Sequence, residues 1–165
     1  MLRQQPARWQ RQLQWIPASR LGAWLFARTL HAIDLPLLRA TRGRLSVPGV
    51  LSGLPVVTLT TVGAKSGLPR SVPVVGIEDG ERVVLIASSY GRPQHPGWYY
   101  NLRRNPDVKL MLHGKSATYH AREVIGEERA AYWRRAVSIY RGFAAYQQRS
   151  GGRILPVLVL TPSGE

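Results

Sequence analysis

Glycine, serine and basic residues are concentrated in the stretch Gly63–Arg70, which reads GAKSGLPR. Its glycines, Gly67 among them, let backbone N–H groups turn toward a ligand, and Ser66 adds a hydroxyl. Lys65 and Arg70 add fixed positive charge. Such a loop predicts the binding of an anion, and phosphate is the group that best matches these donors.

A second run of small and polar residues, ASSYG at residues 87–91, follows the next pair of predicted strands. Pro96 then opens a short aromatic segment, PGWYYNLRRN, which ends before Pro106. Trp98 in this segment is expected to be a structural wall of a pocket, because a tryptophan at the start of an aromatic helix usually packs. Two polar loops separated by apolar strands and closed by this aromatic segment predict a ligand site.

The elements that must position these loops are mostly strands joined by tight turns. Strands are predicted at residues 55–61, 70–77, 82–87, 107–113, 116–124 and 153–161, and helices at 96–105 and 127–140. Pro156 suggests that the last strand lies at an edge or contains a bulge. Tight turns between successive strands indicate an antiparallel sheet, so we expect an α+β fold in which a small six-stranded barrel has helices packed outside.

The N-terminal quarter differs in composition from the rest and predicts a two-part organisation, with an extension at 1–46 and the barrel domain at 47–165. Residues 1–44 hold eight arginines and a single acid, Asp34. The net charge of this segment, 8 − 1 = +7, is half of the chain's formal charge of +14. Two amphipathic helices, at 6–16 and 19–35, are predicted to carry this charge. An anionic membrane surface is one candidate partner, while a solvated face, the domain itself and a second subunit are the alternatives.

Several classes of function are excluded or disfavoured. There is no cysteine, so disulfides and thiolate metal sites are absent and any redox chemistry needs a bound cofactor. The four histidines show no metal-binding spacing, and no metal is expected. Aromatic residues do not alternate with basic ones on the strands, which argues against a nucleic-acid-binding module.

Because Arg28 and Asp34 interrupt the only long apolar run, no membrane span is expected. We expect a cytoplasmic protein, with peripheral contact at the inner face of the cell membrane left open.

The motifs taken together resemble a known family. They are TTVGAKSG with Arg70 and Pro73, then SSYG, then PGWYYNL with the Asn105-Pro106 pair. In this combination and order they resemble the deazaflavin-dependent nitroreductase family, which belongs to the flavin/deazaflavin oxidoreductase superfamily with a split β-barrel fold. The resemblance runs from about Pro55 to the C-terminus.

The resemblance implies that the cofactor is coenzyme F420, a deazaflavin with a phosphate-linked polyglutamate tail. Lys65, Ser66 and Arg70 would hold the phosphate and tail, and Pro73 and Val74 would line the ring. The full set of residues that it assigns to the cofactor is Lys65, Ser66, Gly67, Arg70, Pro73, Val74, Ala87, Ser88, Ser89, Tyr90, Gly91, Pro96, Trp98 and Asn101. Ser88 would lie near the reactive edge of the ring, with Tyr140 or Tyr146 as the proton donor.

The expected activity is hydride transfer from reduced F420 to an electrophilic, lipophilic acceptor of the quinone, enone or nitro type. Two departures from the nitroreductase pattern bear on the acceptor, because Val75 and Phe143 stand where characterised members carry tyrosines. An oxidoreductase that binds flavin mononucleotide (FMN) is one alternative, and a deazaflavin carrier or sensor without catalysis is another. The resemblance also leaves a homodimer open.

Overall fold

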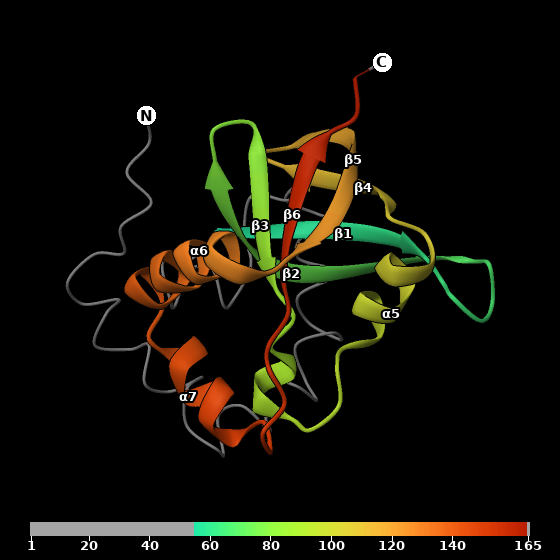
Figure 1. The fold of residues 1–165 in the computed structure, drawn as a ribbon. Coiled ribbons are helices and arrows are strands. Elements are labelled where there is room, and N and C mark those ends of the chain that lie inside the picture. Colours follow the sequence, from blue (N-terminus) through green and yellow to red (C-terminus); the bar gives the residue numbers. More distant parts are fainter. Residues whose placement is uncertain (1–54, 165) are drawn as a thin grey trace.

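The computed structural model describes residues 55–164, which form a closed six-stranded β-barrel with helices on its outside (Figure 1). The strands are β1 (Val56–Val62), β2 (Pro69–Asp79), β3 (Arg82–Ile86), β4 (Asp107–Leu112), β5 (Lys115–Val124) and β6 (Val157–Pro162). The helices are the 3-10 turn η1 (Ser89–Gly91), α5 (Gly97–Arg104), α6 (Gly126–Ile139) and α7 (Gly142–Arg149). The predicted α+β barrel is confirmed.

Every neighbouring pair of strands in the barrel is antiparallel. The order is β1-β2-β3-β6-β5-β4, and β4 closes the barrel by pairing with β1. β6 therefore lies between β3 and β5, and the prediction from Pro156 of an edge strand or a bulge is wrong. Pro156 precedes the strand, and its carbonyl oxygen accepts a hydrogen bond of 2.9 Å from the Ala87 N–H. A proline lacks only the N–H, so this position suits it.

Two hydrophobic cores lie on opposite faces of β3 and β6. Because side chains alternate along a strand, each of these strands contributes to both cores. Residues that face the barrel interior include Val83, Leu85, Leu158 and Leu160, whereas those that face α6 and α7 include Val84, Ile86, Val157 and Val159. Burial on both faces explains why these strands read as continuous apolar runs rather than as alternating patterns.

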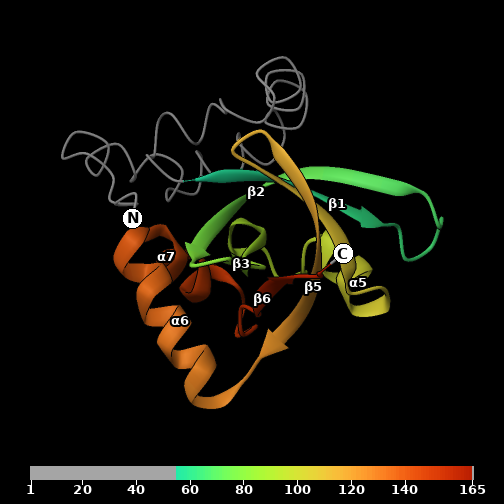
Figure 2. The ribbon, with the colours of Figure 1, turned by 90° about the horizontal axis from the view of Figure 1, so that it is seen from above.

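The helices lie on two sides of the barrel, with α5 on one side and α6 and α7 on the other (Figure 2). α7 is absent from the predicted elements, and Pro96 is the residue before α5 rather than its first residue, because its carbonyl oxygen accepts the Tyr99 N–H at 3.0 Å. Within residues 55–164 no helix has the length and apolar character needed to cross a membrane. The predicted helices at 6–16 and 19–35, the boundary at residue 46 and the membrane contact lie outside the described residues.

Candidate active site

The loop between β1 and β2 is a compact turn closed by its own backbone. The Gly63 N–H donates to the Leu68 carbonyl and the Gly67 N–H donates to the Gly63 carbonyl, both at 2.8 Å. Gly67 has a φ of 68°, in the left-handed region that favours glycine. A Cβ atom at Gly63 would lie 2.5 Å from the Ser66 hydroxyl oxygen and 3.2 Å from the Leu68 carbonyl oxygen, so a larger residue there would displace the Ser66 side chain. The predicted anion loop is therefore built as a rigid turn.

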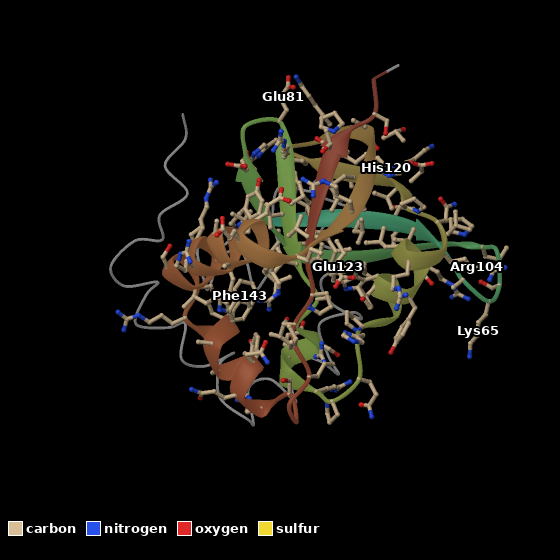
Figure 3. The ribbon with its side chains drawn as sticks, in the orientation of Figure 1. Lys65, Glu81, Arg104, His120, Glu123 and Phe143 are labelled. Atoms are coloured by element: carbon tan, nitrogen blue, oxygen red, sulfur yellow. The ribbon has the colours of Figure 1, made fainter. Side chains whose placement is uncertain are left out.

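The basic side chains of this loop lie exposed at its surface. Lys65 stands near the tip of the loop and points away from the barrel (Figure 3). Neither Lys65 nor Arg70 forms an ion pair with any carboxylate in the part of the chain from 55 to 164. Their charge is available to a ligand, as an anion site requires.

Asn101 joins α5 to this loop. Its side-chain oxygen accepts the Ala64 N–H at 2.9 Å, and its side-chain nitrogen donates to the Thr61 hydroxyl at 2.9 Å. Thr61 is buried, and its hydroxyl also lies 3.4 Å from the Arg70 carbonyl oxygen. One amide thus connects the helix, the end of β1 and the loop, so Asn101 positions the loop rather than only fixing the helix.

The first half of β2 has one open edge. Residues Pro69–Val75 pair with β1, but pairing with β3 begins only at Gly76. The Gly76 N–H donates to the Pro55 carbonyl at 3.0 Å, so the backbone polar groups of Gly76 point toward β1. These groups alternate in direction along a strand, so the backbone polar groups of Ser71 and Pro73 point away from β1. No described strand pairs with that side. The edge therefore offers backbone hydrogen-bonding groups to a ligand, and Pro73, which has no N–H, fits an unpaired position.

The η1 turn follows the end of β3, where the pairing of β3 with β2 stops. Ser89 and Tyr90 have φ values of 49° and 56°, and Gly91 follows with 77°. Successive left-handed residues other than glycine are sparsely populated and cluster at functional sites. A Cβ atom on Gly91 would lie 2.9 Å from the Tyr146 carbonyl oxygen, so the turn is packed directly on α7. Ser88 precedes the turn and is partly exposed, and its hydroxyl has no hydrogen-bond partner among residues 55–164.

Arg153, which is not among the predicted site residues, holds this turn from the opposite side. Its guanidinium donates to the carbonyl oxygens of Ala87, Ser88 and Arg92. It also donates to Nδ1 of His95 at 3.0 Å. Burial, followed by the charge of Arg153, lowers the pKa of His95 below its ordinary value of 6.5, which favours the neutral ring that accepts this bond.

Tyr140 and Tyr146 meet inside the core between the barrel and α7. Both side chains are buried, and their hydroxyl oxygens are 2.9 Å apart. Phe143 makes edge contacts with both rings, and Tyr90 of the turn contacts the Tyr146 ring edge-on. Burial raises the pKa of Tyr140 to about 12 and also raises that of Tyr146, so both phenols are neutral near pH 7.

The predicted site residues fall into two groups. The loop group (Lys65, Ser66, Gly67 and Arg70) is joined to α5 through Asn101, and the turn group (Ala87 to Gly91) lies against α7. Pro73 and Val74 lie on β2 between the two groups in sequence. Pro96 and Trp98 lie at the start of α5, where Trp98 is partly buried against the barrel core. Tyr140 and Tyr146 are buried beneath the turn group, not at the surface.

Comparisons with known proteins identify the family. The sequence model of a family described as F420H(2)-dependent quinone reductase matches residues 33–162. An F420H(2)-dependent quinone reductase of Mycobacterium tuberculosis (strain ATCC 25618 / H37Rv) is 34% identical over 130 residues, covering 76% of this chain and 85% of that protein. The chain belongs to the F420H(2)-dependent quinone reductase family.

Solved structures agree with this assignment. A structure titled as an F420-H2 dependent reductase, FDR-A, is 40% identical with a TM-score of 0.59, and the match covers 64% of this chain and 93% of that one. Another, titled as a domain-swapped dimer, is 34% identical with a TM-score of 0.61, and the match covers 84% of this chain and 97% of that one. The predictions of a split β-barrel, an F420-dependent oxidoreductase and reduced F420 as its cofactor are confirmed, while the FMN alternative gains no support.

The residues of the site fit the cofactor of the F420H(2)-dependent quinone reductase family. Lys65 and Arg70 supply cations for a phosphate and for tail carboxylates, and the rigid loop adds a hydroxyl at Ser66. The open edge of β2 supplies backbone donors and acceptors for the polar rim of a planar ring. Ala87, where the turn begins, is fully buried in the barrel core. The cations would thus match the anionic groups of F420, and the edge of β2 would match the polar rim of its ring.

Replacing Asn101 with alanine is expected to loosen the phosphate loop. The change removes the acceptor of the Ala64 N–H and a partner of the buried Thr61 hydroxyl. We expect faster amide hydrogen exchange at Ala64 and a loss of stability of about 1–2 kcal/mol. Asn105→Ala at the end of the same helix is the matched control, since within residues 55–164 its side chain accepts only the exposed Asp107 N–H at 3.2 Å. Equal exchange at Ala64 in both variants would contradict the assigned role of Asn101.

Proposed function

We propose that this chain reduces a quinone-type acceptor with hydride from reduced F420 held along the open edge of β2. The observation that carries the proposal is the edge Pro69–Val75 of β2, with which no strand pairs on the side away from β1 within residues 55–164. This edge begins beside the loop Gly63–Arg70 and ends near the residues that lead from β3 into η1. The family match supports both the cofactor and the acceptor class.

Two groups of residues divide the binding of the cofactor between them. The charges of Lys65 and Arg70 bind the phosphate and the carboxylates of the tail, and the turn that Asn101 holds keeps these charges in place. Pro73, on the side of β2 that faces away from β1, would contact the apolar ring of the bound cofactor. Val74 packs against the barrel core and Ala87 is fully buried, so both would support this site from within. Such a division fixes the ring through a distant charged anchor, so that the reacting atoms are oriented without strong contacts of their own.

Bound F420H2 would supply a hydride, and a proton taken up with it completes the reduction of a quinone to a hydroquinone. Ser88 has a hydroxyl with no partner among residues 55–164 and lies at the turn, so it can donate a hydrogen bond to the quinone carbonyl. Burial keeps the Tyr140 and Tyr146 hydroxyls neutral and paired with each other. Proton donation by either tyrosine stays a prediction, and their packing supports the turn from beneath.

The decisive experiment follows oxidation of reduced F420 by the wild-type protein under anaerobic conditions, with a soluble naphthoquinone as acceptor. We expect saturable binding of F420H2 and quinone-dependent oxidation that is faster than the reaction without protein. Reduced FMN and a nitroaromatic compound serve as the alternative cofactor and acceptor. Binding without turnover of any acceptor would support a carrier, and binding of FMN alone would contradict the proposed cofactor site.

We also propose that the protein pairs with a second copy of itself. The support is the solved relative titled as a domain-swapped dimer, whose match covers 84% of this chain. Light scattering coupled to gel filtration measures the mass directly against the monomer mass of 18.4 kDa. A monomer at all concentrations tested would contradict this proposal and leave the cofactor site unaffected.

A further inference from the structure

The guanidinium of Arg153 uses every donor that it has on one short segment of chain. Nη1 donates to the Ala87 carbonyl at 3.1 Å and to His95 Nδ1 at 3.0 Å. Nη2 donates to the carbonyls of Ser88 and Arg92 at 2.9 and 2.8 Å, and Nε donates to the Arg92 carbonyl at 3.2 Å. An arginine has five N–H donors in a fixed plane, so this set satisfies all of them. The acceptors flank η1 on both sides.

The backbone of Arg153 is itself fixed by the end of α7. The Gln147 side chain donates to the Arg153 carbonyl at 2.7 Å and accepts the Leu155 N–H at 2.9 Å. The buried Ser150 hydroxyl lies 2.6 Å from the same carbonyl oxygen. Because α7 also contacts the turn directly at Gly91, helix, arginine and turn form one closed unit.

The turn needs such external support. Its own backbone bonds are the Gly91 N–H to the Ser88 carbonyl and the Arg92 N–H to the Ser89 carbonyl, both at 3.0 Å. Left-handed φ values at Ser89 and Tyr90 cost free energy that these two bonds must offset. Conformations of this kind persist only where surrounding contacts determine them. The five bonds from Arg153, together with the packing of α7 on Gly91, supply such contacts.

We propose that Arg153 is a positioning residue for F420 binding, acting by holding the Ser88–Gly91 turn in its left-handed shape. The inference rests on the proposed function, because it takes the turn to be one wall of the ring site. All five N–H donors of the Arg153 guanidinium bind backbone carbonyls and His95, so Arg153 acts through the turn rather than by contact with the ring. Its effect is therefore on the shape of the site before the cofactor arrives.

Two variants and one control test this role. Arg153→Ala removes all five donors, whereas Arg153→Lys keeps the charge but cannot reproduce the planar fork. Arg134→Ala removes an exposed cation of α6 and serves as the control. Amide hydrogen exchange at Gly91 and Arg92 is measured without cofactor. The Ala87 amide serves as an internal reference, because it donates to the Pro156 carbonyl just before β6 and not to the turn. F420H2 affinity is measured by fluorescence titration.

We expect exchange at Gly91 and Arg92 to rise by about tenfold or more in Arg153→Ala, and F420H2 affinity to fall by a similar factor. The exchange rates and the F420H2 affinity of Arg153→Lys should lie between those of the wild type and Arg153→Ala. Those of Arg134→Ala should match the wild type. Guanidinium chloride at a few millimolar should restore part of the lost affinity in Arg153→Ala, while sodium chloride at the same concentration should not.

The outcomes separate this inference from the proposed function. If Arg153→Ala and Arg153→Lys bind F420H2 with the affinity of the wild type, the positioning role is overturned and the proposed cofactor site is unaffected. Faster exchange with unchanged affinity would overturn it as well, because the turn would then be irrelevant to the cofactor. No binding of F420H2 by the wild type would overturn the proposed function and this inference together.

Discussion

Replacing Lys65 and Arg70 together with alanine is expected to weaken the binding of reduced F420 by about 100-fold or more. Hydrogen bonds to charged groups contribute about 1.5–3 kcal/mol each, and each 1.4 kcal/mol is a tenfold change in affinity. Both side chains are exposed, and neither forms an ion pair within residues 55–164. Their removal breaks no ion pair in that part of the fold, so the free energy of unfolding should change little. Fluorescence titration with F420H2 measures the affinity.

A double variant with the same change in charge is the control for this experiment. Lys115→Ala with Arg134→Ala also removes two exposed cations, from the start of β5 and from α6. If the protein attracted F420H2 only through its net charge, the two double variants would lose affinity equally, and the specific role of the loop would be contradicted. Added salt should weaken binding more in the wild type than in Lys65→Ala/Arg70→Ala, since screening acts on charges that the variant lacks.

The barrel could be predicted from the sequence because its signals are local. Runs of β-branched residues bounded by Gly, Pro and acidic turns placed all six strands, and tight turns implied antiparallel pairing. The predicted start of the last strand at residue 153 is wrong, because β6 begins at Val157 and residues 153–156 form a connection without regular secondary structure. α7 was missed because a helix of eight residues depends on tertiary packing, here of Phe143 and Tyr146, more than on its own sequence.

The two halves of the site differ in how far the sequence reveals them. The loop at Gly63–Arg70 carries its chemistry in its own residues, so composition and spacing indicated an anion site. Arg153 acts on backbone carbonyls, which every residue has, so nothing in the sequence marks its partners. The sequence leaves two interpretations of Tyr140 and Tyr146, as packing aromatics or as groups that orient or protonate the substrate. The structure places their hydroxyls against each other in the core, an arrangement that depends on how α7 docks.

Gly142→Ala is expected to destabilise the fold by about 2 kcal/mol or more, because it removes the space that the Tyr140 ring occupies. A Cβ atom on Gly142 would lie 2.1 Å from Cζ and 2.3 Å from the hydroxyl oxygen of Tyr140. The ring is 3% exposed and in contact with Phe143 and Tyr146, so it cannot move aside without breaking these contacts. Chemical unfolding followed by near-ultraviolet circular dichroism measures the loss.

Gly97→Ala is a matched control, because Gly97 and Gly142 are both the first residues of short helices. A Cβ atom on Gly97 would meet nothing within 4 Å, so this change should be neutral or slightly stabilising, as alanine favours helices over glycine. A double-mutant cycle with Tyr140→Leu isolates the cause. In the Tyr140→Leu background, Gly142→Ala should lower the free energy of unfolding much less than it does in the wild type. An equal loss of stability in both backgrounds would show that Gly142 is needed for the backbone conformation of α7 instead. The Tyr140–Tyr146 pair would then be independent of Gly142.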